Sequence, residues 1–269
     1  MKGKTMKYEF GFIGVGNMGG AIADAVCRTV AAGSVAVCDP DEKKTSAFKE
    51  KYGAAVLSSD EIASSCRFLV LGVKPQVLPA VMNDLRPKLS DGTVVVSMAA
   101  GISIAAIEGG LSSRPVVRIM PNTPCAVGHG LILYHPNALV KEDDLAALLA
   151  GFAGAGTLCP IAEDKIDAAS AVSGCGPAFA YLFVEALADA GVECGLARAD
   201  AQKFAALMLE GSAKMVLETG RHPGELKDAV CSPGGTTIVG VRALEEGGFR
   251  SAAMNAVRAA YLRTLELKK

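Results

Sequence analysis

The chain has 269 residues, 51% of them hydrophobic, and its 27 Lys and Arg residues nearly balance its 28 Asp and Glu residues. This balance excludes a protein that reads nucleic acid through a strongly basic surface, and the hydrophobic content excludes a disordered chain. The length suits one or two domains. Uncharged stretches such as 145–162 are broken by glycines and a proline, so we expect no membrane span.

The first residues, MKGKTMK, are basic but lead directly into an apolar strand pattern, without the apolar region or the cleavage site of a secretion signal. We therefore expect a cytoplasmic protein. The 8 cysteines form no CxxC pair, and most lie in apolar runs. We expect reduced, structural thiols, with neither disulfides nor a metal site.

The first half of the chain alternates apolar strand patterns with segments of helix length, which is typical of a doubly wound α/β sheet covered on both faces. The predicted strands are 8–13, 35–38, 55–57, 68–73, 94–97 and 116–119. The predicted helices between them are 18–30, 43–52, 59–65, 76–85 and 104–111. A short helix at 145–152 and an edge strand at 156–160 are expected to follow.

The last hundred or so residues show helix patterns alone, so we expect an all-α second part. Its predicted helices are 167–190, 199–218, 223–230, 236–246 and 249–267. The first of them is apolar around most of its circumference, whereas a surface helix shows one apolar stripe. We expect its surplus apolar face to pack against another subunit; burial wholly within one chain is the alternative.

The string GVGNMG, residues 14–19, follows the first predicted strand directly and opens the first predicted helix. In this GxGxxG pattern the first glycine permits a tight turn, the second lets backbone amides approach a pyrophosphate, and the third allows close helix packing. The N-terminus of the helix then faces the anion. In this context the pattern predicts dinucleotide binding by a Rossmann-type sheet.

Asp39 stands at the end of the second predicted strand, about twenty positions beyond the last glycine of that pattern. A carboxylate there accepts a hydrogen bond from the ribose 2'-OH and repels a 2'-phosphate, so the local physics favours NADH. Two alternatives remain open. The DPD segment caps the next helix, or Lys43 and Lys44 offset the charge.

Three later strands end in VKP (73–75), SMAAG (97–101) and RIMPNTP (118–124), at the carboxyl edge where open α/β sheets bind ligands. Lys74 is not expected to be catalytic, because the following proline sets the turn and backbone groups can hold the cofactor. The small residues of the other two loops suit close approach of a nicotinamide ring. The alternative for residues 118–124 is that the two prolines only end the strand and make the loop rigid, without contact to a ligand.

Two segments of the helical half are unusual. SGCGPA (173–178) inserts two glycines and a proline into a helix pattern, which is costly unless close packing or a ligand requires it. CSPGGTT (231–237) is a turn that runs into a helix, and its hydroxyl-rich N-terminus suits an anion such as a carboxylate. An ordinary helix cap is the alternative.

The sequence resembles the pyrroline-5-carboxylate reductases over essentially its full length and in the right order. The resemblance rests on the blocks GFIGVGNMG, GVKPQVL, SMAAGIS, VRIMPNTPCAVGHG, SGCGPAFAYLFVEALADAGV and HPGELKDAVCSPGGTTIVGVRALEEGGFR. The last block is the most specific, because many Rossmann enzymes share the first.

This resemblance implies hydride transfer from NAD(P)H to the C=N carbon of 1-pyrroline-5-carboxylate, which gives L-proline in the last step of proline biosynthesis. It implies an N-terminal Rossmann domain at 1–163 and an all-α substrate-binding and dimerisation domain at 164–269. Two copies would interleave through the second domain as a dimer, in some members assembled further into a decamer. We expect neither nucleic acid nor a membrane as partner.

Site residues are carried over from the family by motif. The substrate carboxylate and ring would be bound by Ser232, Gly235, Thr236 and Thr237. Residues 13–18 would hold the pyrophosphate. Asp39 would bind the adenosine ribose, and Ser59 would lie near the same end of the cofactor. Residues 73–75 and 98–100 would line the nicotinamide, and Glu163 would touch the cofactor. The cofactor-binding set is Ile13, Gly14, Val15, Gly16, Asn17, Met18, Asp39, Ser59, Val73, Lys74, Pro75, Met98, Ala99, Ala100 and Glu163.

The chain departs from the family pattern in two places. Cys175 stands where a second serine is usual, which changes packing only, and a serine, threonine or arginine is common near Asp39, which leaves NADH or NADPH undecided. A cyclic imine is easily protonated near neutral pH, so the reaction needs no strong general acid, and the three histidines, 129, 135 and 222, are expected to be structural. Thr237 is the candidate catalytic residue, by orienting the substrate.

Two other functions fit part of the pattern. A β-hydroxyacid dehydrogenase would carry a lysine on the glycine-rich helix SGCGPAFAYLF, which has none. A dinucleotide-binding regulator without turnover would not need the SPGGTT segment, because a sensor needs no carboxylate site.

Overall fold

The computed structural model describes residues 6–31 and 33–267, and the chain forms two compact units. The first contains the chain up to Gly174 together with the segment from Tyr261 onward, and the second runs from Cys175 to Ala260. The sequence-based boundary between residues 163 and 164 stays a prediction, because compactness alone does not define a domain.

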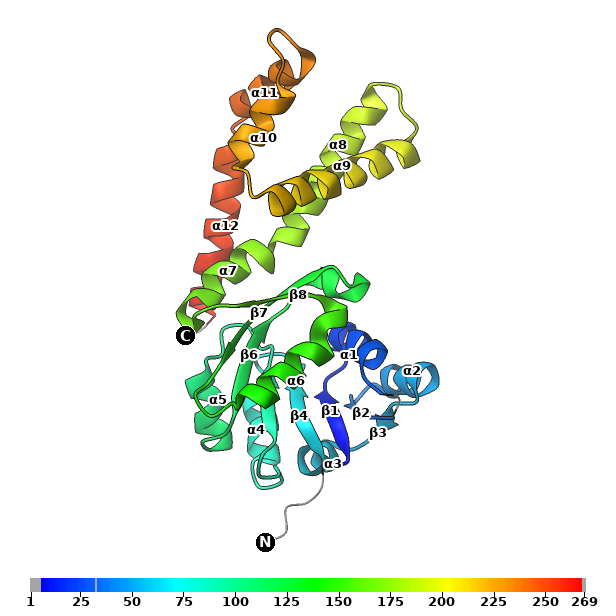
Figure 1. Cartoon of the computed structure of the whole chain (residues 1–269), viewed down its shortest axis with the longest axis vertical. Coiled ribbons are helices and arrows are strands. Elements are labelled where there is room, and N and C mark those ends of the chain that lie inside the picture. Colours follow the sequence, from blue (N-terminus) through cyan, green and yellow to red (C-terminus); the bar gives the residue numbers. More distant parts are fainter. Residues whose placement is uncertain (1–5, 32, 268–269) are drawn as a thin grey trace. The chain divides into compact units, whose positions relative to one another are not determined.

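The first unit is built around one mixed sheet of eight described strands, in the order β3-β2-β1-β4-β5-β6-β7-β8 (Figure 1). Neighbouring strands are parallel except for the antiparallel pair β6 and β7. The strands are β1 Tyr8–Ile13, β2 Val35–Cys38, β3 Ala55–Val56, β4 Cys66–Leu71, β5 Val94–Ser97, β6 Val116–Met120, β7 Gly130–Pro136 and β8 Gly156–Pro160. The Rossmann-type doubly wound sheet is confirmed.

Helices cover both faces of this sheet (Figure 1). One face packs against α1 and α6, with Phe48 of α2 at the edge of the same cluster, and the other packs against α3, α4 and α5. Apolar strand residues on both faces are buried, as expected for parallel strands. The helices are α1 Asn17–Thr29, α2 Glu42–Tyr52, α3 Ser59–Ser65, α4 Leu78–Leu85, α5 Ile104–Leu111, α6 Glu142–Phe152 and α7 Ile166–Ser173, with short 3-10 turns η1 Thr123–Val127, η2 Ala153–Ala155 and η3 Glu163–Lys165.

The observed elements differ from the predicted ones at several places in this unit. Helix α6, for example, starts at Glu142 rather than at residue 145. Strand β7 was not predicted, although its apolar run LILY lies between Gly130 and Pro136. Strand β4 ends at Leu71 rather than at residue 73, so residues 72–75 form the loop at its end. Helix α4 starts at Leu78 rather than at residue 76, because Pro79 lacks an N–H and is tolerated only in the first helical turn.

The single helix predicted over 167–190 is wrong, because the structure divides it into α7 and α8. In a continuous helix the carbonyl of Ser173 would accept a hydrogen bond from residue 177, but Pro177 has no N–H. Asn122 supplies the missing donor, since its Nδ2 lies 3.0 Å from that carbonyl oxygen, and its Oδ1 accepts from the N–H of Leu131 at 2.9 Å. A buried side chain thus satisfies the carbonyl exposed by the break.

The described part of the second unit is all-α, as predicted. Its helices are α8 Gly176–Glu193, α9 Arg198–Thr219, α10 Pro223–Val230, α11 Thr236–Glu246 and α12 Phe249–Glu266, the last of which ends in the first unit. Helices α8 and α9 pack on each other, and a ring contact between Phe183 and Phe249 joins α8 to α12.

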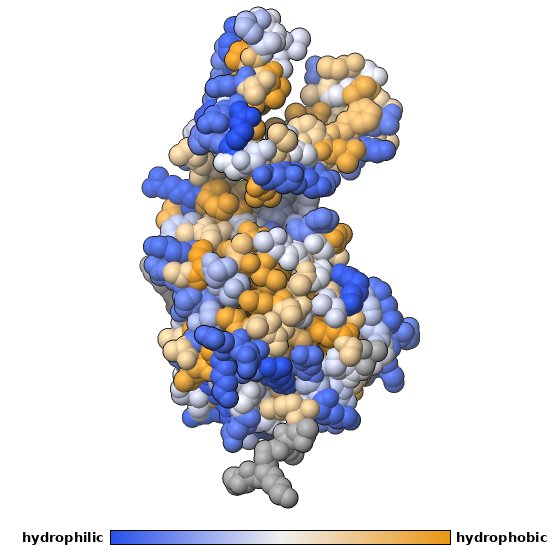
Figure 2. All heavy atoms as spheres, in the orientation of Figure 1, coloured by the Kyte–Doolittle hydropathy of each residue, from blue (hydrophilic) through white to orange (hydrophobic). Residues whose placement is uncertain are grey.

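Large hydrophobic side chains are exposed along this helical unit (Figure 2). They include Tyr181 and Leu182 on α8, both more than 60% exposed, and Met208 on α9. The run Glu163–Glu193 is long and apolar enough, by length and composition, to span a membrane, and only 11% of its most apolar window is buried. The alternative of a helix buried within one chain is therefore wrong for α8: its buried residues comprise Ala188 alone among those described.

Candidate functional site

Two glycines of the glycine-rich segment after β1 are in close backbone contact with a third glycine, which follows β4. Gly14 has a φ of +91°, a left-handed conformation, and a Cβ there would lie 2.8 Å from the carbonyl carbon and oxygen of Gly72. A Cβ on Gly19 or on Gly72 would overlap the carbonyl oxygen of Gly14. The ends of β1 and β4 and the start of α1 therefore approach one another as only glycine allows.

Gly16 has a different role in the same turn. It is the N-cap of α1, its φ is −67°, and a Cβ there would meet no protein atom within 4 Å. No side chain caps this helix end, so its first N–H groups are left for a partner outside the helix. The open space at Gly16 and the uncapped helix N-terminus fit a pyrophosphate, which needs close backbone approach and N–H donors.

A cleft of about 500 Å³ opens at this edge of the sheet. Seven of the predicted cofactor-binding residues line it: Ile13, Gly14, Gly16, Asp39, Ser59, Val73 and Lys74. Val15, Asn17 and Met18 are adjacent in the turn and the first helical turn, and Pro75 follows Lys74. The structure thus brings the ends of β1, β2 and β4 and the start of α3 around one space, as the sequence predicts.

Asp39 lies on the wall of this cleft with its side chain 8% exposed. Its Oδ2 accepts a hydrogen bond from the N–H of Val15 at 2.9 Å, and its Oδ1 accepts from the N–H of Asp41 at 3.0 Å. The Nζ of Lys44 lies 3.8 Å from Oδ1. Asp41, not Asp39, caps α2 by accepting from the N–H of Lys43, so the capping alternative does not explain Asp39.

A thiol also borders the cleft. Burial, and secondarily the charge of Asp39, raise the pKa of the Cys38 thiol, with a backbone hydrogen bond at Ser59 acting in the opposite direction. The thiol is therefore neutral at physiological pH and is a poor nucleophile. Burial likewise raises the pKa of Cys66 to about 12, and all 8 cysteines are free thiols.

The loop after β5 carries the predicted residues Met98, Ala99 and Ala100, and they are not among the residues that line the cleft. The N–H of Ala99 lies 3.4 Å from the hydroxyl of Ser97. Glu163, on η3, is also outside the cleft: its Oε1 accepts from the N–H of Ile104 at 2.7 Å and from Arg118 at 3.3 Å. Contact of these residues with a cofactor stays a prediction.

The predicted substrate-binding residues form a turn in the second unit, between α10 and α11. Gly235 is the N-cap of α11, its N–H donates to the carbonyl of Ser232 at 3.0 Å, and a Cβ there would overlap the Ser232 hydroxyl. No side chain caps α11, and Thr236 and Thr237 form its first turn. The predicted residues therefore belong to two units of the chain, the cofactor set to the first and the substrate set to the second.

Comparison with known proteins identifies the family. The family model for pyrroline-5-carboxylate reductase dimerisation matches residues 163–267, and that for NADP oxidoreductase, coenzyme F420-dependent, matches residues 9–101. A pyrroline-5-carboxylate reductase of Escherichia coli (strain K12) is 42% identical over 268 residues, which cover 98% of this chain and 100% of that protein. The chain belongs to the pyrroline-5-carboxylate reductase family. A Synechocystis relative of the same name is 41% identical, with 98% and 100% covered.

Solved structures of this family resemble the structure of this chain over nearly its whole length. The pyrroline carboxylate reductase of Plasmodium falciparum, with NADP bound, has a TM-score of 0.88 at 33% identity, and covers 99% of this chain and 100% of its own. The Coxiella burnetii pyrroline-5-carboxylate reductase has a TM-score of 0.89 at 32% identity, with 98% and 99% covered. As a pyrroline-5-carboxylate reductase family member, the chain is an NAD(P)H-dependent oxidoreductase with a dinucleotide-binding domain.

Eight residues that line the cleft lie outside the predicted set, and Gly72 and Lys44 among them lie directly beside predicted site residues. Gly72 completes the glycine contact with Gly14 and Gly19, and the signal for it is its place directly after an apolar strand, in GVKP. Lys44 was noted only as a nearby charge, but it lines the cleft beside Asp39. The other lining residues outside the predicted set are Cys38, Pro40, Val77, Val81, Asp84 and Leu85.

Two of the three histidines make side-chain hydrogen bonds to nearby backbone. The Nδ1 of His135, on β7, lies 2.8 Å from the carbonyl oxygen of Ile161. His222 caps α10 by accepting from the N–H of Gly224. Among the described residues, no group of three or more His, Cys, Asp or Glu is arranged to hold a metal ion.

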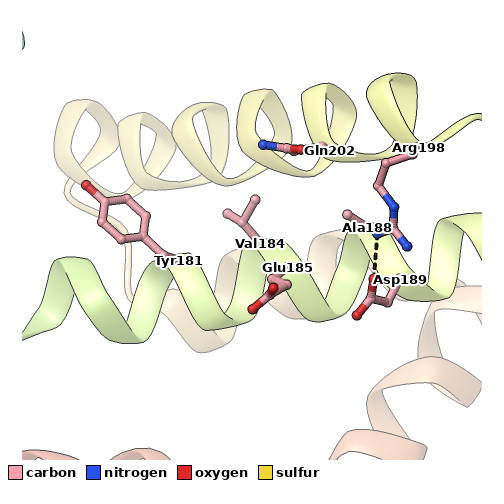
Figure 3. A pocket seen from close by; sticks show the side chains of 7 residues that line it. All are labelled: Tyr181, Val184, Glu185, Ala188, Asp189, Arg198 and Gln202. Atoms are coloured by element: carbon pink, nitrogen blue, oxygen red, sulfur yellow. Dashed lines mark hydrogen bonds and ion pairs between the residues drawn. The ribbon is translucent and has the colours of Figure 1, made fainter.

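A second hollow lies between α8 and α9 and is lined by Tyr181, Val184, Glu185, Ala188, Asp189, Arg198 and Gln202 (Figure 3). It measures about 520 Å³. Its charged groups are partly satisfied within the hollow, since Arg198 is paired with Asp189. None of the predicted site residues lies there, and we assign it no role in the reaction.

Proposed function

We propose that this chain reduces 1-pyrroline-5-carboxylate to L-proline, the last step of proline biosynthesis. The observation that carries the proposal is the full-length match to enzymes of that name at about 40% identity. The close contact of Gly14, Gly19 and Gly72 and the open space at Gly16 support it, because together they suit a dinucleotide at the end of β1.

The residues that line the cleft would hold the cofactor. The turn of residues 13–18 and the start of α1 face the pyrophosphate, Asp39 accepts from the adenosine ribose, and Ser59 lies near the same end. Residues 73–75 and 98–100, which follow β4 and β5, line the nicotinamide, and Glu163 touches the cofactor. When bound, NAD(P)H supplies the hydride that is transferred to the C=N carbon.

The uncapped start of α11 would bind the substrate carboxylate. Its free N–H groups and the positive end of its dipole favour an anion, and Ser232, Thr236 and Thr237 add hydroxyl donors. The imine nitrogen carries the proton before hydride arrives, so no strong general acid is needed. The role of Thr237 is orientation of the ring, which alone contributes large rate gains.

The cofactor is NADH rather than NADPH, because Asp39 is a carboxylate on the cleft wall. A 2'-phosphate would be placed against this charge, and Asp41 lies close by. Lys44 offsets these charges only in part, since it lies 3.8 Å from Asp39 and 3.6 Å from Asp41 and is 45% exposed.

The helical unit mediates self-association through its exposed apolar helices, as a dimer or, as in some members of the family, as a decamer, and the protein is cytoplasmic. The match of residues 163–267 to a dimerisation model and the exposure of Tyr181 and Leu182 support this. We expect the protein to purify without detergent and to elute with at least twice the monomer mass in size-exclusion chromatography with light scattering. A monomer, or a protein recovered only in detergent, would refute this part.

The function is tested by following NADH and NADPH oxidation separately with 1-pyrroline-5-carboxylate, and by identifying L-proline as the product. We expect oxidation of the reduced cofactor when 1-pyrroline-5-carboxylate is present, and a higher kcat/KM with NADH than with NADPH. Absence of oxidation with either cofactor would refute the proposed activity, and a strong NADPH preference would refute the interpretation of Asp39 alone.

Replacement of Thr237 by alanine should raise the KM for 1-pyrroline-5-carboxylate and lower kcat/KM about tenfold, while the KM for NADH changes little. Loss of one hydrogen bond to a charged group costs about 1.5 kcal/mol, which corresponds to that factor. Thr237→Ser keeps the hydroxyl and serves as the matched control, which should retain most of the activity. Unchanged steady-state kinetics for Thr237→Ala would remove this residue from the site.

A further inference from the structure

Arg118 is a charged side chain in the middle of the sheet. It lies on β6, within the apolar sequence VVRIM, and only 2% of its side chain is exposed. Buried charges are costly unless they are paired and hydrogen-bonded. The contacts that Arg118 makes therefore indicate what the fold gains from it.

Two carboxylates face the Arg118 guanidinium. Its Nη2 donates to Oδ1 of Asp167 at 2.8 Å, and its Nη1 donates to Oε1 of Glu163 at 3.3 Å. Asp167 is 6% exposed and Glu163 is 29% exposed. The buried Nε of Arg118 has no hydrogen-bond partner among the described residues. The cluster joins β6 to η3 and to α7.

Stability alone does not account for such a cluster. A buried ion pair is often no more stable than apolar residues of the same size, and here one donor is left without a partner. Such groups can instead fix a specific arrangement of the chain. We therefore asked which backbone the cluster holds.

Glu163 connects the cluster to the loop after β5. Its Oε1 accepts from the N–H of Ile104, the first residue of α5, at 2.7 Å. Ser103 caps the same helix end by accepting from the N–H of Ala106 at 3.2 Å. The residues directly before it, 98–102, include those that the proposed function assigns to the nicotinamide. Glu163 thus fixes the end of that loop from a different element.

Arg118 in turn keeps Glu163 in place. Glu163 lies on a three-residue turn with no buried residues, and a hollow of about 370 Å³ opens on Arg118, Glu163 and Asp167. Because 29% of the Glu163 side chain is exposed, water can reach its carboxylate. Without the guanidinium, the carboxylate would gain hydration by turning away from Ile104.

We propose that Arg118, which is paired with Asp167, is a positioning residue for hydride transfer: through Glu163 it holds the start of α5 and so the nicotinamide loop 98–103. This inference rests on the proposed function. Arg118 acts on the loop through Glu163 and has no assigned contact with substrate or cofactor. Its loss should lower kcat and leave the KM for 1-pyrroline-5-carboxylate nearly unchanged.

The experiment compares four variants with the full-length wild type. Arg118→Met/Asp167→Leu removes both buried charges together, so that neither is left unpaired. Glu163→Ala removes the acceptor for Ile104, and Glu163→Gln keeps an oxygen there. Asp144→Ala is the matched control, because it breaks the ion pair with Arg67 on β4, at 2.7 Å, and contacts no assigned site residue.

Each variant is measured for kcat, KM, the melting temperature without cofactor, and the primary isotope effect with NADH deuterated at the transferred position. We expect about a tenfold lower kcat and a larger isotope effect for the double variant and for Glu163→Ala, since a misplaced nicotinamide slows the chemical step. Glu163→Gln should restore most of kcat. Asp144→Ala should change the melting temperature only.

Wild-type kcat and isotope effect in a folded double variant would overturn the inference. If the double variant does not fold, equal kinetics for Glu163→Ala and wild type would overturn it. A raised NADH KM for Glu163→Ala with no effect of the double variant would also overturn it, because Glu163 would then act on the cofactor without help from Arg118. Absence of turnover in the wild type would refute the proposed function itself.

Discussion

Replacement of Gly16 by alanine is expected to weaken NADH binding about 100-fold while the melting temperature of the free protein stays nearly unchanged. The added Cβ meets no protein atom within 4 Å, and the φ of −67° suits any residue. The fold therefore has no need of glycine here. A pyrophosphate that approaches the start of α1 would need the space that the methyl group fills.

The expected loss of NADH affinity is about 100-fold, which corresponds to about 2.8 kcal/mol. It is measured by titration calorimetry, alongside thermal unfolding without cofactor. Gly109→Ala is the matched control, because that glycine on α5 is also free of neighbours within 4 Å and lies outside the cleft. Gly72→Ala is the opposite control, whose Cβ would overlap the carbonyl oxygen of Gly14 and lower the melting temperature.

Normal NADH affinity for Gly16→Ala would show that the pyrophosphate does not lie over this residue. A large drop in the melting temperature of the free protein would show a structural need for glycine that the described contacts do not contain. Either result would remove the main geometric support for the assigned cofactor position.

Features of the fold that depend on local sequence could be predicted. The glycine pattern of residues 14–19 works through backbone conformation next to a strand, so its place and its role followed from adjacent residues. The position of Asp39 at the end of β2 followed from the strand length in the same way. The surplus apolar face of α8 was also predictable, because its sequence is apolar around most of the helix circumference whereas a surface helix shows one apolar stripe.

Features that depend on contacts between distant segments could not be predicted. The division of α7 from α8 needs Asn122, which lies 51 residues away from Ser173 and supplies the donor that a proline lacks. The role of Gly72 needs the carbonyl of Gly14 from another strand. The ion pairs of Arg118 were not predicted, because its two carboxylate partners lie 45 and 49 residues further along the chain.

The substrate half of the site is assigned by motif alone and stays a prediction. Nothing in the spacing of residues 232–237 distinguishes an ordinary helix start from a carboxylate site. The role of Thr237 therefore has to be tested by enzyme kinetics. The test on Gly16, in contrast, starts from the free space that the structure shows around that residue.

Asp39→Asn is expected to shift the ratio of kcat/KM for NADPH to that for NADH by about 100-fold in favour of NADPH. Two unit charges 4 Å apart interact by about 4 kcal/mol at an effective dielectric constant of 20, so removal of one repulsion can supply the 2.8 kcal/mol needed. The amide also frees Lys44, now 3.8 Å from the carboxylate, to face a 2'-phosphate. The kcat/KM for NADH should fall, because an acceptor for the ribose is weakened.

Asp41→Asn is the matched control for this shift, because it removes the same charge two residues away. Asp41 caps α2 through Oδ1, a contact that an asparagine oxygen can keep, and its Oδ2 lies 3.6 Å from Lys44. If the preference depends on the carboxylate on the cleft wall, Asp41→Asn should change the ratio by less than about threefold. Equal shifts in the two variants would mean that net local charge, and not the position of Asp39, determines which cofactor is used.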